Sequence, residues 1–253
     1  MAGILHLGSN RDATISSDLV STEVVIERRF RGPPQSGNGG YSCGVVAEGV
    51  TGVATVTLRL PPPLDRPLTL TGDERQSRLT DGENIVGEAI QSTLDLDVPE
   101  APGLEEAMEA ARHYAGFEAH PFPGCFVCGP ERAPGDGLRI FPGRVGNTAI
   151  VAAPWTPDDS LRGADGMVGR RHVWAALDCP SYFGLPSAPL ALLGRLTASI
   201  ERMPEVGEPL VAIGWPIDVE GRKSFAGSAL ADLEGEVLAR AAATWIQIDA
   251  LPL

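Results

Sequence analysis

The sequence predicts an α+β protein whose two halves repeat one arrangement of elements. In each half a strand leads into a loop rich in glycine or basic residues. A short apolar helix with one acid follows, and then several antiparallel strands. A repeated order of this kind indicates an internal duplication. Residue identity between the halves is weak, so the prediction rests on the order of elements and on the helix that carries an acid.

Length and composition limit the class of protein and its partners. A chain of 253 residues has room for one large domain or for two domains. The net charge of −13 disfavours nucleic acid and anionic membranes as partners, because both require basic patches. No signal peptide and no apolar run of a membrane-spanning helix is present, so we expect a cytoplasmic protein. Lys223 is the single lysine beside many arginines, which is typical of a GC-rich bacterial genome.

The first half shows a clear series of strands and turns. Residues 1–20 form a leader without periodicity, and residues 21–116 form the N-terminal unit. A strand over 21–31 stops at a Gly-Pro-Pro sequence, and the glycine-rich turn 35–40 precedes a small, apolar stretch at 41–50. Alternating patterns then predict strands at 53–60, 67–71, 75–79 and 84–91, and a helix at 104–114.

A segment rich in proline, glycine and cysteine, residues 117–137, separates the two units and is expected to be the junction between them. Residues 138–253 form the C-terminal unit. Its patterns predict strands at 138–141, 148–153, 191–202, 209–219, 222–233 and 237–249. Glu220-Gly221 and Glu234-Gly235 have the composition of hairpin turns.

Residues 170–184 form the apolar helix of the second half, and Asp178 lies near its middle. A carboxylate in an apolar helix needs a partner, because burying an unpaired charge is costly. Asp178 is therefore the main candidate for a functional residue, although it could instead cap a loop or pair with Arg170 or Arg171. Pro180 removes a helical hydrogen bond, so we expect the helix to bend or end near residues 176–179.

Three short motifs resemble the hotdog family of thioesterases. Ser36-Gly37-Asn38-Gly39-Gly40-Tyr41 resembles the start of the central helix in double-hotdog acyl-CoA thioesterase-like proteins. Ala175-Ala176-Leu177-Asp178 resembles the same helix in single-hotdog thioesterases, and residues 227–248 resemble the last two strands of that superfamily. The resemblance implies two tandem hotdog folds in one chain, each a bent antiparallel sheet that wraps a central helix. The two units would pair back to back.

The resemblance also implies a site. Gly39 and Gly40 match the glycines whose backbone N–H groups polarise the thioester carbonyl. Asp178 matches the acid that acts as general base or nucleophile. In the first half the family acid aligns with Glu48, or with Ala47 if the alignment shifts by one residue. The second half has arginines where glycines are expected, so we predict one complete site per chain, in which the Gly39/Gly40 turn faces Asp178.

Four further residues are predicted to contact the substrate. Arg171 and His172 lie at the start of the second helix and are expected to line the way into the site. Ser36 and Asn38 could orient a water molecule or a carbonyl group, although such residues are also ordinary turn formers.

The expected activity is hydrolysis of an acyl-CoA or a similar thioester. The alternative is a non-catalytic protein that binds an acyl chain or small lipid. By analogy with single-chain pairs of this fold, a homodimer that forms through sheet edges is expected. The sequence has no Gly-x-Ser-x-Gly motif and no phosphate-binding loop, which disfavours α/β hydrolases and nucleotide enzymes.

The cysteines permit another interpretation. His120, Cys125 and Cys128, with His113 upstream, offer four soft ligands, so zinc is possible, although no metal or other cofactor is the favoured prediction. Strong zinc patterns have two close pairs of ligands, and a redox Cys-x2-Cys usually opens a helix. Reduced, buried thiols that pack the junction are therefore favoured.

Overall fold

The computed structural model describes residues 19–187 and 190–250. Its centre is one antiparallel sheet of 11 strands. The strands are β1 (Val20–Val25), β2 (Ala54–Leu58), β3 (Pro67–Gly72), β4 (Gln76–Asp81), β5 (Asn84–Gln91), β6 (Gly143–Arg144), β7 (Val151–Trp155), β8 (Ala191–Ile200), β9 (Leu210–Glu220), β10 (Lys223–Ala231) and β11 (Val237–Gln247). The helices are α1 (Gly39–Val46), α2 (Leu104–Arg112), α3 (Arg170–Ala176) and α4 (Asp178–Phe183).

The order of the strands repeats. Across the sheet it is β1-β3-β4-β5-β2-β8-β11-β10-β9-β7-β6. The first half contributes β1-β3-β4-β5-β2, and the second half, read from its far side, contributes β7-β9-β10-β11-β8 after the short edge strand β6. The halves join where β2 pairs with β8, and there the hydroxyl groups of Thr55 and Thr197 lie 2.9 Å apart. Main-chain hydrogen bonds therefore run across the boundary between the halves.

Alternating burial is clear in β11. Ala239, Ala241, Ala243 and Trp245 are buried, and the residues between them are more exposed, as expected when alternate side chains face the core. Gly221 joins β9 to β10 at φ 58°, and Gly235 lies between β10 and β11 at φ 86°. Glycine adopts these left-handed conformations at little cost, and both hairpins predicted from the sequence are present.

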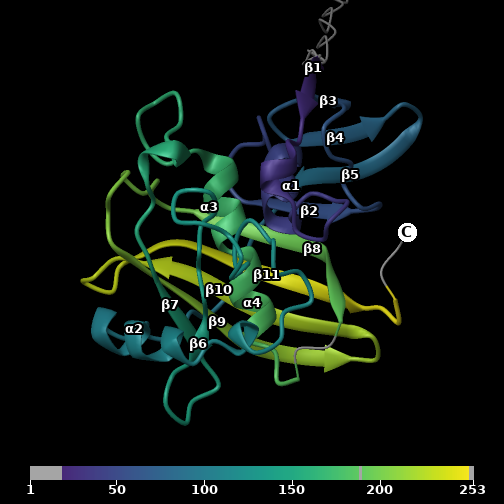
Figure 1. Ribbon diagram of the computed structural model, residues 1–253. Coiled ribbons are helices and arrows are strands. Elements are labelled where there is room, and N and C mark those ends of the chain that lie inside the picture. The colour runs from purple at the N-terminus through teal and green to yellow at the C-terminus, as the bar shows by residue number, and fades with distance from the viewer. Residues whose placement is uncertain (1–18, 188–189, 251–253) are drawn as a thin grey trace, which may run out of the picture.

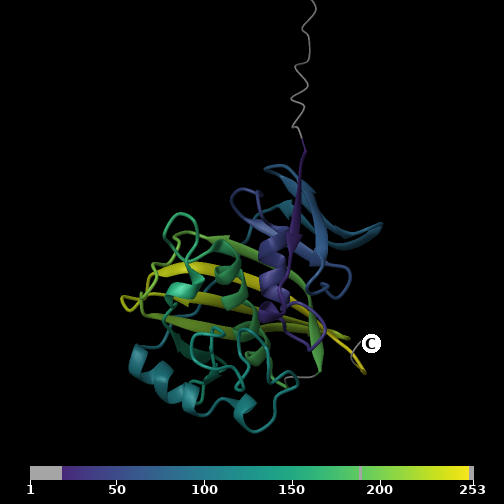
Figure 2. The same ribbon diagram turned by 45° about the horizontal axis from the view of Figure 1, so that its top comes forward.

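Helices α1 and α3 pack side by side against the sheet, one from each half (Figures 1 and 2). Two glycines of α1 permit this close approach. A Cβ atom on Gly44 would lie 2.7 Å from Arg171 Cα, and one on Gly40 would lie 3.1 Å from Ala175 Cα. Since no larger residue fits at these contacts, the small residues of α1 set the distance between the helices.

The second helix is broken where the sequence predicts it. α3 ends at Ala176 and α4 begins at Asp178. Pro180 has no N–H to continue the helical ladder. Buried serines bind the carbonyl groups next to the break: Ser228 Oγ donates to Leu177 O at 2.6 Å, and Ser181 Oγ donates to Asp178 O, also at 2.6 Å. These bonds fix the start of α4, and thus the position of Asp178.

Helix α2 lies on the opposite face of the sheet. Ala107 and Ala110 pack with Val211 and Ile213 of β9. Gly214 follows Ile213 in the strand, so it lies on the opposite face, where it contacts Pro180 of α4. In Figures 1 and 2, α2 accordingly lies apart from α1 and α3, beside β6 and β7. Both faces of the first part of β9, residues 210–215, are thus covered by helices.

The predicted strand at 138–141 is wrong. Leu138 and Ile140 donate backbone hydrogen bonds to Phe126 and Val127, but Arg139 between them has φ 54°, which an extended strand does not allow. The junction 117–137 is more than a surface linker, because Phe126 and Val127 are fully buried. It forms part of the core beneath both halves.

Three further sequence predictions concern the leader, membrane-spanning helices and the homodimer. The predicted leader 1–20 lies outside the described residues except for its last two positions, and β1 begins at Val20. In the part of the chain that is described, no helix has the length and apolar character needed to cross a membrane. The free edges of the sheet are β1 and β6. The predicted homodimer through sheet edges stays a prediction.

The contact between α1 and α3 gives a test of the packing. The Gly44→Ala variant should lower the free energy of unfolding by about 1–3 kcal/mol, because its methyl group would overlap the backbone of Arg171. That cost exceeds the gain of about 1 kcal/mol in helix propensity. Urea denaturation measures the difference. Gly103→Ala is the matched control, since no atom lies within 4 Å of the added carbon. A Gly44→Ala variant as stable as this control would contradict the close contact.

Candidate functional site

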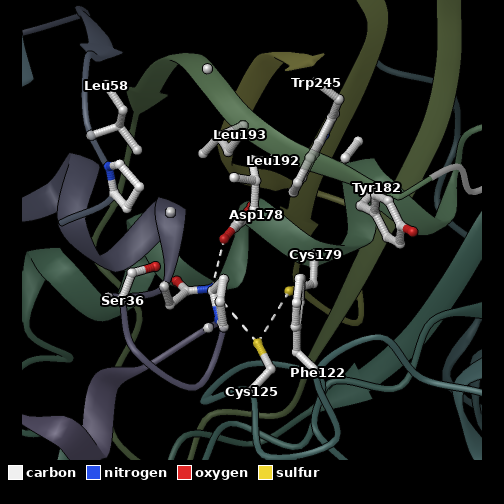
Figure 3. Close-up of a pocket in the computed structure, with 18 of the residues that line it drawn as sticks. Ser36, Leu58, Phe122, Cys125, Asp178, Cys179, Tyr182, Leu192, Leu193 and Trp245 are labelled. Carbon is white, nitrogen blue, oxygen red and sulfur yellow. Dashed lines mark hydrogen bonds between the residues drawn. The ribbon is translucent and has the colours of Figure 1, made fainter. Parts of the chain in front are cut away.

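A cavity of about 260 Å³ lies where the two halves and the junction meet (Figure 3). Its walls are mostly apolar. The first half contributes the turn 36–39 and the segment 58–62, the junction contributes residues around Phe122, and the second half contributes α4, β8 and β11. Tyr182 and Trp245 form one wall, with ring centroids 5.0 Å apart. Among the described residues that line this cavity, Asp178 is the sole acid.

Asp178 is held by groups from the other half. Its side chain is almost fully buried, with 2% of the residue exposed. Oδ2 accepts a hydrogen bond from Asn38 Nδ2 at 2.7 Å and one from the backbone N–H of Gly40 at 2.9 Å. Oδ1 is buried as well and has no hydrogen-bond partner among the described residues. The carboxyl group is therefore held through one oxygen, and its other oxygen is buried without a partner.

Asn38 is oriented by its position at the start of α1. It is the N-cap residue, and its Oδ1 accepts a hydrogen bond from the backbone N–H of Tyr41 at 2.9 Å. With Oδ1 used by the cap, the amide nitrogen must face Asp178. Gly40 must be glycine for a related reason, because a Cβ atom there would lie 2.5 Å from Asp178 Cβ.

Burial raises the pKa of Asp178 to about 7. The hydrogen bonds from the Gly40 N–H and from Asn38 oppose this rise, and the nearby Cys125 thiol adds to it. The effect of burial on the pKa is larger than that of the hydrogen bonds. The buried anion loses its hydration, and two donors do not replace that hydration fully. Perturbed carboxyl groups in clefts are typical of functional sites.

The two predicted glycines differ in what their N–H groups do. The Gly40 N–H binds Asp178 and is not available to a substrate carbonyl, in contrast to the prediction from the resemblance. Within the described part of the chain, the Gly39 N–H has no hydrogen-bond partner. Gly39 lines the cavity, and it is the first residue of α1. An unpaired donor at the positive end of this helix therefore belongs to a residue of the cavity wall.

Glu48 lies away from the cavity. It is at the surface and forms an ion pair with Arg171, with 2.7 Å between Oε2 and Nε. Ala47 is its neighbour and lies nine residues after the N-cap of α1 (38 to 47), just as Asp178 lies nine residues after the N-cap of α3 (169 to 178). Ala47 is thus the positional counterpart of Asp178, and the structure does not bring Glu48 or Arg171 to the site.

His172 and Ser36 have different surroundings. His172 is half-buried at the start of α3, where Nδ1 lies 3.1 Å from Leu161 O and the ring lies near Phe30 and Tyr41. Burial lowers its pKa. His172 does not line the cavity, whereas Ser36 is buried and does line it.

Three cysteines gather beside Asp178. Cys125 and Cys128 come from the junction and Cys179 from α4, and their sulfur atoms all lie within 4.8 Å of one another. His120 Nε2 lies 3.3 Å from Cys128 Sγ. Hydrogen bonds from the Cys128 and Cys179 thiols hold the pKa of Cys125 well below its usual range. The fourth candidate ligand, His113, is on the exposed side of α2 and pairs with Glu109.

Several residues of the site could not be found from the sequence. Cys179 lies more than 50 positions after Cys125, and only the fold brings the two together. The apolar walls, which include Phe122, Tyr182, Leu193 and Trp245, have the composition of ordinary core residues. The one available signal was that α4 carries a cysteine directly after the acid.

The comparisons with known proteins concern the fold. Neither the protein-family models nor the curated proteins gave a match to the sequence. Solved structures do match. A protein provisionally named an oleoyl thioesterase, from Lactobacillus plantarum, has a TM-score of 0.57 and 10% identity, over 93% of this chain and 99% of that one.

Two further structures agree. The tesB protein of Mycobacterium avium subs. paratuberculosis has a TM-score of 0.57 and 12% identity, over 91% of this chain and 96% of that one. A conserved protein of unknown function from Alicyclobacillus acidocaldarius, described as having a hot dog fold, has a TM-score of 0.55 and 9% identity. The match covers 94% of this chain and 96% of that one. The chain therefore has the hotdog fold, which confirms the predicted fold class at this level.

Asn38 gives a test of the site. Asn38→Ala should lower the free energy of unfolding by about 2–4 kcal/mol, because it removes a helix cap and a hydrogen bond to a buried carboxyl group. Asn38→Ser is the matched control. Its hydroxyl group can still cap α1 but is too short to reach Asp178. This variant should therefore lose less stability than Asn38→Ala. Urea denaturation of both variants gives the comparison, and equal stability of Asn38→Ala and the wild type would contradict this arrangement.

Proposed function

We propose that this chain is a tandem pair of hotdog units that hydrolyses an acyl-CoA or a related acyl thioester. The observation that carries the proposal is the buried Asp178 of the second half. It is fixed by the N-terminus of α1 from the first half, at the wall of an apolar cavity. A buried carboxylate with one unpaired oxygen beside a free N–H donor is the pair of groups that hydrolysis of a carbonyl compound needs.

The repeated architecture supports the tandem pair. Both halves have the same strand order, with α1 between β1 and β2 in the first half and the broken helix α3–α4 between β7 and β8 in the second. Contacts between the helices also come in equivalent pairs. Gly40 approaches Ala175, and Gly44 approaches Arg171. Counted from the two N-caps at 38 and 169, Gly40 corresponds to Arg171 and Gly44 to Ala175, so the two contacts are related by exchange of the halves.

The cavity fits an acyl chain. Its walls include Leu58, Phe122, Leu193 and Trp245, none of which offers a charge to a ligand. Burying a methylene group against such walls is worth about 0.8 kcal/mol. Asp178 and the start of α1 form a polar part of the wall (Figure 3), while Arg59, His120 and Tyr182 line it elsewhere. A molecule with a long apolar part and one reactive carbonyl group fits this distribution.

The chemistry proceeds by addition of water. The substrate carbonyl oxygen accepts a hydrogen bond from the Gly39 N–H, and a small movement of the buried carboxyl group lets a water molecule bind the unpaired Oδ1 of Asp178. Asp178 takes a proton as the water oxygen bonds to the carbonyl carbon, and the developing oxyanion is stabilised at the positive end of α1. The carbon–sulfur bond then breaks, and Asp178 returns the proton to the leaving thiolate. The products are a carboxylic acid and a thiol.

Each chain has one such site. At the positions related by exchange of the halves, Ala47 replaces the acid and Arg170 and Arg171 replace the glycines. An arginine there carries a side chain where the backbone would have to approach a substrate. Arg171 pairs with Glu48 instead, which closes this position with a surface ion pair.

The central test compares two carboxylates. Asp178→Asn should lower turnover of acyl-CoA thioesters by about 10²–10⁴-fold, which is the usual contribution of general base catalysis. Asn is isosteric, and its Oδ1 can accept the same two hydrogen bonds, so the thermal midpoint should change little. Glu48→Gln should retain turnover within about twofold, because Glu48 lies at the surface. Release of free thiol, measured across acyl chain lengths from acetyl to oleoyl, gives the rates.

Two results would contradict the proposal. If the wild-type protein hydrolyses none of these thioesters, or if Asp178→Asn matches the wild type, Asp178 is not a catalytic base. A lipid that copurifies with an inactive wild-type protein, identified by mass spectrometry, would favour the non-catalytic acyl-binding protein.

A further inference from the structure

The cysteine cluster is separate from the groups that the proposed hydrolysis uses. Cys125 and Cys128 lie in the loop between His120 and Leu138, and Cys179 lies in the first turn of α4. All three are buried, with at most 6% of any of these residues exposed. The three sulfur atoms lie within 4.8 Å of one another, although they come from two segments far apart in the sequence. A shared ligand explains the convergence.

The distances fit a tetrahedral thiolate site. With zinc–sulfur bonds of about 2.3 Å, two sulfur ligands of a tetrahedron lie about 3.8 Å apart. Cys125 Sγ and Cys179 Sγ lie 3.9 Å apart, and the longest separation in the cluster does not exceed 4.8 Å. Shifts of a few tenths of an ångström to about 1 Å would bring all three sulfur atoms to one ion. Zinc and similar soft ions prefer such ligands.

Hydrogen-bond donors surround the sulfur atoms. Asn38 Nδ2 lies 3.8 Å from Cys125 Sγ, and His120 Nε2 lies 3.3 Å from Cys128 Sγ. Donors aimed at sulfur compensate the charge of a thiolate in a buried site, and such outer groups tune and orient metal ligands.

His120 has a defined role at the cluster. The backbone N–H of Phe122 donates to His120 Nδ1 at 2.9 Å. A backbone N–H can only donate, so Nδ1 is the unprotonated nitrogen and the ring proton is on Nε2. Nε2 lies 3.3 Å from Cys128 Sγ and therefore donates to the sulfur atom. In this arrangement His120 supports a thiolate and does not itself bind a metal ion.

We propose that Cys125, Cys128 and Cys179 bind one zinc ion, or a similarly thiophilic divalent ion, with the fourth coordination position facing the cavity. All three cysteines line the cavity that Asp178 lines, which is why the fourth position opens there. Three protein ligands with one open position are the arrangement of zinc sites that take water or a substrate atom as the fourth ligand. The site does not depend on the proposed hydrolysis.

Metal content tests the proposal directly. The wild-type chain is expressed with zinc in the medium and purified under reducing conditions without chelators, and its zinc is measured by mass spectrometry of the elements. We expect one zinc ion per chain. Exchange for cobalt(II) should give thiolate-to-cobalt charge-transfer bands and the visible bands of a tetrahedral ion. A wild-type chain that holds far less than one ion, and gives no thiolate bands with cobalt, overturns the proposal.

Matched variants separate ligands from bystanders. Cys179→Ala should lose zinc and reduce the charge-transfer intensity at saturating cobalt. Cys43→Ala should keep both, since Cys43 is buried in α1 and is not part of the cluster. Equal metal loss in the two variants would point to general destabilisation and overturn the assignment. A Cys125–Cys179 disulfide in the purified reduced protein, detected by peptide mapping, would overturn it too.

His120 has its own variant. His120→Ala should weaken zinc affinity by about 10–100-fold, as loss of a supporting hydrogen bond does. Its cobalt spectrum at saturation should nevertheless match the wild type, because all three thiolates remain. A displaced visible band in this variant would show that His120 is a ligand, and would overturn the open fourth position.

Discussion

The hydrogen bonds from the start of α1 to Asp178 are the constraint on which the rest of the structure depends. They join groups 138 and 140 residues apart and require that helices from the two halves approach closely. That approach is possible only because Gly40 and Gly44 carry no side chain. Together with the pairing of β2 and β8, it makes the two halves one continuous body. The acid and the groups that hold it cannot be separated without opening the core.

Exchange of the halves relates two positions, and only one of them has kept the groups of a site. The first half has the glycines and Ala47, whereas the second half has the arginines and Asp178. A change in only one of the two halves would cost stability. A buried acid opposite Arg170 and Arg171 would find a different partner, and glycines opposite an alanine would leave a void. The Arg171–Glu48 ion pair fills the second position at the surface. Both changes agree with the proposed single site per chain.

Much of the fold could be predicted from the sequence, because alternating strands and hairpin glycines are local signals. The break at Pro180 and the facing of Gly40 and Asp178 also follow from local chemistry combined with the repeated order. Other features could not be predicted. The left-handed Arg139 breaks a segment whose composition is that of a strand, and the choice between Glu48 and Ala47 depends on a register that only the packed helices fix. Cys179 joins the cysteines of the junction through tertiary contacts alone.

The junction explains why the acid and the sulfur atoms share one cavity. Asn38 contacts both, since its amide donates to Asp178 Oδ2 and also lies 3.8 Å from Cys125 Sγ. Cys179 follows Asp178 directly in α4, so any movement of the cluster displaces the carboxyl group as well. A ligand bound by the three sulfur atoms would thus stabilise the start of α4 in the position that Asn38 and Gly40 require. The loop at 117–137, which the sequence presents as a connection between units, is then the third component that holds the acid in place.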